Sequence, residues 1–118
     1  MPDISKDARI KKEITRLKRI FKNIDENKLK TLEGVIDKAA FMRVILDDME
    51  QRIIMNGWDD EYQNGENQRG TKASPAAQLH LSMTKNYLAA IKLLVENAPP
   101  AERKNSKLAA MRGEADDD

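Results

Sequence analysis

Residues 26–57 have the sequence ENKLKTLEGVIDKAAFMRVILDDMEQRIIMNG, and this stretch decides the fold. Asp25 precedes it as a candidate N-cap, because a short carboxylate can accept hydrogen bonds from the first backbone amides of a helix. Gly57 closes it, since glycine adopts positive φ without penalty. The pattern predicts a single helix of about thirty residues, roughly 45 Å long at ~1.5 Å per residue.

Apolar residues recur along this helix at helical spacing. One seam, continued after a three-residue step, contains Leu29, Leu32, Ile36, Ala39, Met42, Leu46, Met49 and Ile53. One short partner helix can hardly cover a surface this long and this apolar, so we expect copies of the chain to associate through it. The predicted oligomer interface consists of Leu32, Ile36, Met42, Leu46, Met49 and Ile53.

Two further helices flank the long one. Ser5 can cap a first helix, whose apolar stripe contains Ile10, Ile14, Leu17, Phe21 and Ile24. Ser74-Pro75 predicts the start of a third helix, and Ala98-Pro99-Pro100 predicts its end. The sequence therefore predicts an all-α fold: a helical hairpin with one long central helix plus a third helix after a polar loop, oligomerising through the long helix.

The remaining segments divide the chain into a body and a tail. Residues 57–73 have no apolar period and form the polar loop, in which Asn64-Gly65 could turn a short hairpin. We expect residues 1–98 to form one helical DNA-binding and oligomerisation domain. Residues 99–118 are expected to be a flexible tail, with a weak helical segment around Leu108 and Met111 and an acidic end.

Composition argues against an enzyme. The 118 residues include no cysteine and one histidine, which excludes disulfides, thiol nucleophiles and a histidine-pair metal site within one chain. Neither Gly65 nor Gly70 begins a Walker-type phosphate loop. Neighbouring helical residues point about 100° apart, so Asp47-Asp48 is a poor carboxylate pair. We expect no catalytic residue, no metal and no cofactor, and interpret His80 as a hydrogen-bonded or surface side chain.

Charge is segregated along the chain although the net charge is only +1. Residues 1–30 carry a net +5, residues 31–66 a net −6 and residues 67–118 a net +2. A basic helix can neutralise nucleic-acid phosphates, although a merely solvated face, partly compensated by Asp7 and Glu13, is the alternative. The predicted DNA-binding residues are Lys11, Lys12, Arg16, Lys18, Arg19 and Lys22. No stretch approaches the ~18 apolar residues of a membrane span, so no membrane partner is expected.

An acidic and aromatic cluster, residues 58–62, follows the long helix directly. Trp and Tyr are favoured anchors at interfaces, so the cluster could bind a partner protein. The alternative, which we favour, is that Trp58 packs the loop onto the helix ends.

The layout resembles the small terminase subunits of tailed bacteriophages over roughly residues 10–100. The residues that carry the resemblance are Leu17-Lys18-Arg19-Ile20-Phe21, Ile53-Ile54-Met55-Asn56-Gly57, Tyr62-Gln63-Asn64-Gly65-Glu66-Asn67-Gln68, Lys72-Ala73-Ser74-Pro75-Ala76, Lys85-Asn86-Tyr87 and Leu93-Leu94-Val95. Members often close the last helix with a single Leu-Pro-type turn, whereas this chain has Ala98-Pro99-Pro100.

The resemblance implies a non-enzymatic component of a viral DNA-packaging motor. Such subunits form ring-shaped homo-oligomers, bind double-stranded viral DNA and deliver it to the large terminase subunit, in the cytoplasm of the infected bacterial host. Two alternatives from other classes remain at this point: a structural helical protein that only associates with itself, and a small DNA-binding regulator.

Overall fold

The computed structural model describes residues 5–57 and 75–112, and within these ranges the fold is all-α. The helices are α1 (Lys6–Ile20), α2 (Glu26–Asn56), α4 (Pro75–Asn97) and α5 (Arg103–Arg112), with a short 3-10 helix η2 (Pro100–Glu102) before α5. The predicted long helix and the helices on either side of it are confirmed. None of the helices in the described part of the chain is long and apolar enough to cross a membrane.

Local chemistry sets the helix ends. The Ser5 hydroxyl accepts a hydrogen bond from the Ala8 amide at 3.1 Å and so caps α1. The Asp25 carboxylate caps α2 by accepting from the amides of Asn27 and Lys28 at 3.2 and 3.3 Å. At the other end of α2, Gly57 has φ 83°, a conformation that side chains with a Cβ rarely adopt.

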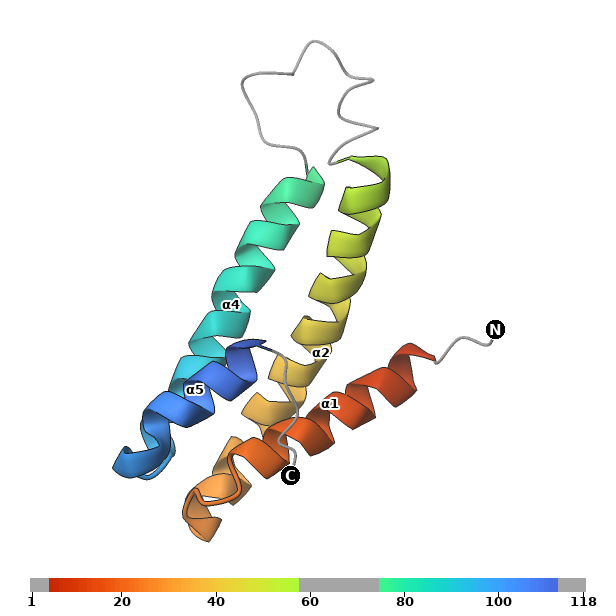
Figure 1. The fold of residues 1–118 in the computed structure, drawn as a ribbon. Helices are drawn as coiled ribbons and strands as arrows, with labels where there is room; N and C mark the ends of the chain where they lie inside the picture. The colour runs from red at the N-terminus through yellow and green to blue at the C-terminus, as the bar shows by residue number, and fades with distance from the viewer. Residues whose placement is uncertain (1–4, 58–74, 113–118) are drawn as a thin grey trace.

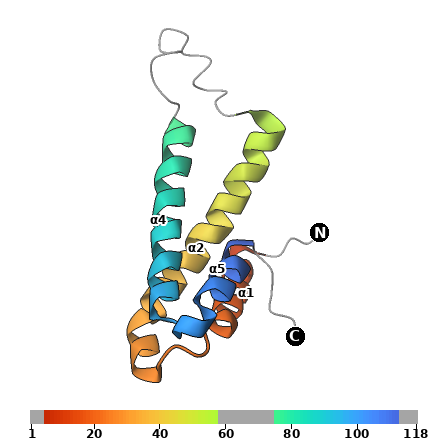
Figure 2. The same cartoon turned by 60° about the vertical axis from the view of Figure 1, so that its left-hand side comes forward.

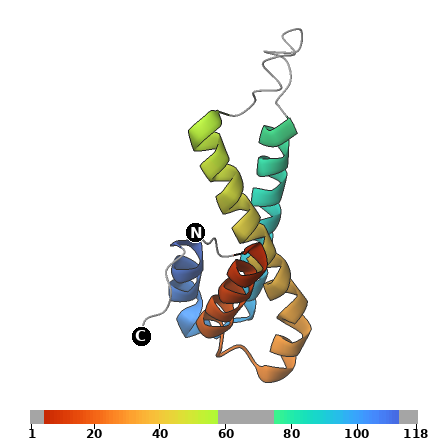
Figure 3. The same cartoon turned by 90° about the vertical axis from the view of Figure 1, so that its right-hand side faces the viewer.

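The long helices α2 and α4 run side by side in opposite directions (Figure 1). Helices α1 and α5 lie against the half of this hairpin where α2 begins and α4 ends (Figures 2 and 3). The other half, formed by the last turns of α2 and the first turns of α4, extends beyond both short helices. We call this projecting half, residues 50–56 and 75–82, the arm.

The core lies between all four helices. Its largest fully buried side chains come from α1, the turn after α1, α2 and α4: Leu17, Phe21, Ile36, Ile91 and Leu94. Three of the predicted oligomer-interface residues, Leu32, Ile36 and Leu46, are buried in this same core. Met42 packs against it in a partly buried position, and Met49 and Ile53 are also partly covered.

The seam of α2 is therefore covered largely by the chain itself. The prediction that copies must associate to hide it assumed one short partner helix, whereas α1, α4 and α5 together surround α2. Leu32, Ile36 and Leu46 are buried within the single chain in this fold, and their contact with a second copy stays a prediction. The exposed apolar residues of α2 are instead Phe41, Ile54 and Met55, the last two 77% exposed.

The segment predicted as a flexible tail contains a packed helix. The weak helical pattern around Leu108 and Met111 corresponds to α5, which contacts both α4 and α1. Ala110 is completely buried and Ser106 nearly so. The packed helices thus extend to Arg112, beyond the boundary expected at residue 98. The Asn64-Gly65 turn, the residue 58–62 cluster and the acidic residues after Gly113 lie outside the described residues.

Candidate nucleic-acid interface

The outward face of α1 carries a continuous set of basic side chains. Lys11 and Lys18 lie about two helical turns apart, and Lys12 and Arg19 form a second row about 100° around the helix. All four are exposed, as is Lys22 in the turn that follows α1. Five of the six predicted DNA-binding residues are therefore brought together on one surface, which we call the basic face: Lys11, Lys12, Lys18, Arg19 and Lys22.

The opposite side of α1 fixes the orientation of the basic face. Ile10, Ile14 and Leu17 follow the helical repeat and pack into the core, so the lysines must point away from it. At the N-terminal end, Arg9 and Lys6 both pair with Asp48 of α2, at 2.8 and 3.6 Å. These two cations hold α1 against α2 and lie outside the basic face.

Arg16 is the predicted DNA contact that the structure places elsewhere. It is only 9% exposed and pairs with Glu13 through two hydrogen bonds of 2.6 and 2.8 Å. Its guanidinium also donates to the backbone carbonyls of Ala109 and Ala110 at 3.2 and 3.4 Å. Arg16 therefore joins α1 to the end of α5 and is buried, unlike the other five predicted DNA-binding residues.

Few acidic groups oppose the basic face. Lys11 pairs with Asp7 at 3.5 Å, but both side chains are more than three-quarters exposed, where such pairs contribute little. Among the described residues, no ion pair involves Lys12, Lys18 or Lys22. The positive charges of these three lysines are thus not balanced by an ion pair within the described ranges.

Helix α5 lies beside α1 and runs in the opposite direction. The Asn23 amide after α1 donates to both carboxylate oxygens of Glu102, just before α5, at 3.0 and 3.1 Å. At the other end, Arg16 reaches the last turn of α5. Lys104 and Lys107 of α5 are exposed, but Lys107 lines a groove toward α4 and so belongs to a different surface from the basic face.

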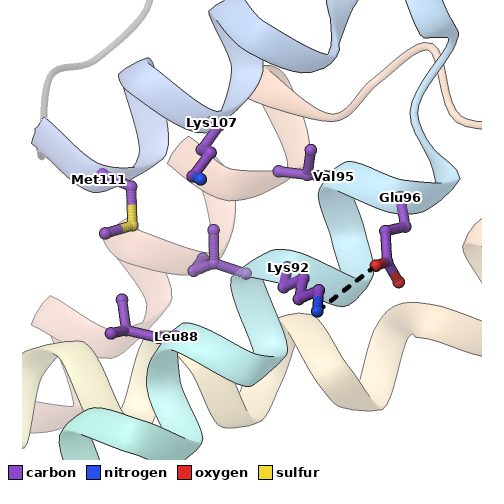
Figure 4. Close-up of a pocket in the computed structure, with 7 residues that line it drawn as sticks. Leu88, Lys92, Val95, Glu96, Lys107 and Met111 are labelled. Carbon is purple, nitrogen blue, oxygen red and sulfur yellow. Dashed lines mark ion pairs between the residues drawn. The ribbon is translucent and has the colours of Figure 1, made fainter.

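That groove, about 460 Å³ in volume, lies between α4 and α5 (Figure 4). Leu88, Ile91 and Val95 of α4 and Met111 of α5 form its apolar lining. Lys92 and Glu96 form an ion pair at its edge, at 4.0 Å. The sequence analysis did not find the groove, because it depends on the unexpected packing of α5.

A half-buried polar cluster centred on Arg43 was also missed. The Arg43 guanidinium donates to the Tyr87 hydroxyl at 3.0 Å and to the Ala110 carbonyl at 3.4 Å, and pairs with Asp47 at 3.5 Å. Burial raises the pKa of Asp47, although the nearby Arg43 opposes this shift. An arginine inside the apolar run Met42-Arg43-Val44 was the available signal. The cluster ties α2 to α4 and α5.

The remaining candidate chemical groups have structural partners. His80 lies 2.9 Å from Glu50 through Nε2, as expected for a hydrogen-bonded histidine. Asp47 pairs with Arg43 of its own helix α2, whereas Asp48 pairs with Arg9 of α1, so the two carboxylates have separate partners. Within residues 5–57 and 75–112, no group of three or more metal-ligating side chains is present.

The site is thus a cationic, solvent-exposed helix face set on a rigid helical body. Such a surface can contact phosphates at several points. Comparisons of this chain with protein families, with curated proteins and with solved structures found no match.

Proposed function

We propose that this chain binds double-stranded DNA through the basic face of α1, as a non-enzymatic adaptor of the small-terminase kind. The observation that supports the proposal is the alignment of Lys11, Lys12, Lys18, Arg19 and Lys22 on one exposed surface with little opposing charge. Each cation placed at a phosphate releases a condensed counterion, so binding is electrostatic and independent of base sequence at this surface.

The fuller proposal follows the resemblance of residues 10–100 to the small terminase subunits. In it, copies of the chain assemble into a ring and deliver viral DNA to the large terminase subunit in the cytoplasm of the infected bacterial host. Repeating the basic face around a ring multiplies a weak contact into a stable one. The exposed apolar residues Phe41, Ile54 and Met55 are the accessible places on α2 where copies can meet.

Salt-dependent DNA binding tests the first part of the proposal. We expect fluorescence anisotropy on a short labelled duplex to give a log–log salt slope of about −4 to −5 per engaged copy, for roughly five phosphate contacts. Replacing Lys11, Lys12, Lys18 and Lys22 with Gln should weaken binding by about tenfold or more at low salt. Salt-independent retention, or full retention by this variant, contradicts the proposal.

A matched control separates a local effect from one of net charge. Replacing the exposed Lys30, Lys38, Lys85 and Lys92 with Gln removes the same number of charges away from the basic face. This control should keep nearly all of the affinity. Equal losses in both variants would mean that only the net charge matters, and the basic face would not be the binding site.

A purely structural role is the second candidate, and the exposed apolar residues of the arm favour it. Ile54 and Met55 are the most exposed large apolar side chains described. Light scattering, which measures the mass of the assembly, distinguishes these candidate functions. A closed assembly well beyond a tetramer supports the ring, a DNA-binding dimer supports a regulator, and an assembly that ignores DNA supports the structural role.

A further inference from the structure

The C-terminal end of α5 is held at a defined place beside α1. Arg16 donates to the carbonyls of Ala109 and Ala110, and Arg43 of α2 also donates to the carbonyl of Ala110 at 3.4 Å. Cationic side chains at the last carbonyls of a helix satisfy its unpaired acceptors and its negative dipole end. The chain therefore leaves α5 at Arg112 next to the middle of α1.

This exit point lies at the border of the basic face. Lys12 is about one turn before Arg16 on α1 and about 40° around the helix from it. Lys18 lies farther round, on the outward side, and both lysines are exposed. Since the Arg16 guanidinium contacts the last turn of α5, Lys12, one helical turn from Arg16, is the cation of the basic face next to this contact.

The residues that follow Arg112 are strongly acidic. They are Gly-Glu-Ala-Asp-Asp-Asp, with carboxylates at Glu114, Asp116, Asp117 and Asp118. At ~3.3–3.6 Å per extended residue, these residues span at most about 20 Å. Lys12 lies about 9 Å from Lys18 along the α1 axis and about 120° from it around the helix, so a segment of this length is long enough to reach Lys12 first.

We propose that the acidic segment 114–118 docks on the basic face of α1 in the same chain and competes there with nucleic acid. Charge complementarity and chain length select this occupant: the four carboxylates follow α5 directly in the sequence, and the basic face carries the exposed lysines Lys11, Lys12, Lys18 and Lys22. Tethering gives the segment an effective concentration on the order of millimolar, enough for weak ion pairs to matter. The competition rests on the proposed DNA binding, whereas the docking does not.

Carbodiimide crosslinking without nucleic acid tests the docking directly. This reagent joins carboxylates to amines only where they are in contact, and mass spectrometry identifies the linked peptides. We expect Asp116, Asp117 or Asp118 to be linked to Lys11, Lys12, Lys18 or Lys22. Links to Lys104 or Lys107 of α5 instead, or no link to any lysine, would overturn the proposal.

An isotopic mixture decides whether the contact is within one chain. Equal amounts of light and ¹⁵N-labelled protein are mixed before crosslinking. Linked peptides should be uniformly light or uniformly heavy. Mixed pairs at the statistical frequency would overturn the intrachain assignment.

Competition is tested with a charge-neutral segment. Replacing Glu114 with Gln and Asp116, Asp117 and Asp118 with Asn should tighten DNA binding by about threefold or more at low salt, and the gain should shrink at high salt. The matched control, Asp59→Asn, Asp60→Asn, Glu61→Gln and Glu66→Gln, makes the same change in net charge. Equal gains in both variants would overturn the competition.

The two proposals fail separately. If no variant binds DNA, the proposed function falls, and the crosslinks alone decide whether segment 114–118 docks. If DNA binds through the basic face while the segment gives no crosslink to α1, only the docking inference falls.

Discussion

Arg16 allows a specific prediction about stability, because its side chain both pairs with Glu13 of α1 and donates hydrogen bonds to α5. Its ion pair with Glu13 has side chains only 10% and 13% exposed, so water screens it weakly. Replacement of Arg16 with Met keeps most of the aliphatic volume. It leaves the Glu13 carboxylate buried without its partner and removes two donors from the end of α5.

The expected loss is large for a domain of this size. Breaking a buried ion pair by removing one partner costs about 3–5 kcal/mol, because the remaining charge is uncompensated. Small domains have a total unfolding free energy of about 5–15 kcal/mol. The double variant Glu13→Gln, Arg16→Met removes the stranded charge, so it should regain at least about 1 kcal/mol relative to Arg16→Met alone.

Urea unfolding followed by far-ultraviolet circular dichroism measures these free energies. Lys12→Met is the control on the same helix, since an exposed substitution should change stability by less than about 0.5 kcal/mol. A loss below about 1 kcal/mol for Arg16→Met would refute the buried linkage of α1 to α5. A double variant Glu13→Gln, Arg16→Met that is less stable than Arg16→Met alone would also refute this reasoning.

Three further perturbations follow from the structure. Because burial raises the pKa of Asp47 above the ordinary value of 3.8, its contribution to stability is present at low pH and is lost as pH rises through the folded-state pKa. The variant Asp47→Asn should therefore gain stability relative to the native chain between about pH 3 and pH 6 in urea titrations, and a constant difference would contradict this. Gly57→Ala should cost about 1–3 kcal/mol in thermal unfolding because of its positive φ, whereas Gly34→Ala inside α2 should gain up to about 1 kcal/mol; similar effects at both sites would refute the backbone argument. Replacing Ile54 and Met55 with Gln should leave the unfolding free energy within about 0.5 kcal/mol while lowering the assembled mass, and an unchanged mass would exclude the arm as a contact between copies.

The helix ends and helix type could be predicted because their causes are local. Ser5, Asp25 and Gly57 act within one turn of their own positions, so a short window of sequence contains the whole interaction. Hydrophobic periodicity likewise identified which faces of α1 and α2 are buried. It could not identify what covers them, and so Leu32 and Ile36 were assigned to a second copy instead of the core.

The sequence predicted most residues of the basic face, but it could not show that Arg16 is buried. Four basic residues of α1, together with Lys22 in the turn after it, share one exposed face, as their spacing allows. Arg16 differs because its partners are carbonyls of Ala109 and Ala110, and no nearby residue signals such a contact. The weak amphipathic pattern of α5 concealed both that contact and the groove beside α4, since small buried residues such as Ala110 give little hydrophobic signal.

The hydrogen bonds between Arg16 and the last turn of α5 have a consequence for folding during translation. The two hydrogen bonds join residues 93 and 94 positions apart in the chain. A ribosome adds roughly 5–20 residues per second, so the first helix emerges about 5–20 s before its carbonyl acceptors have been synthesised. During that interval Arg16 lacks its two carbonyl acceptors in α5, and the N-terminal helix completes its native packing only at the close of translation.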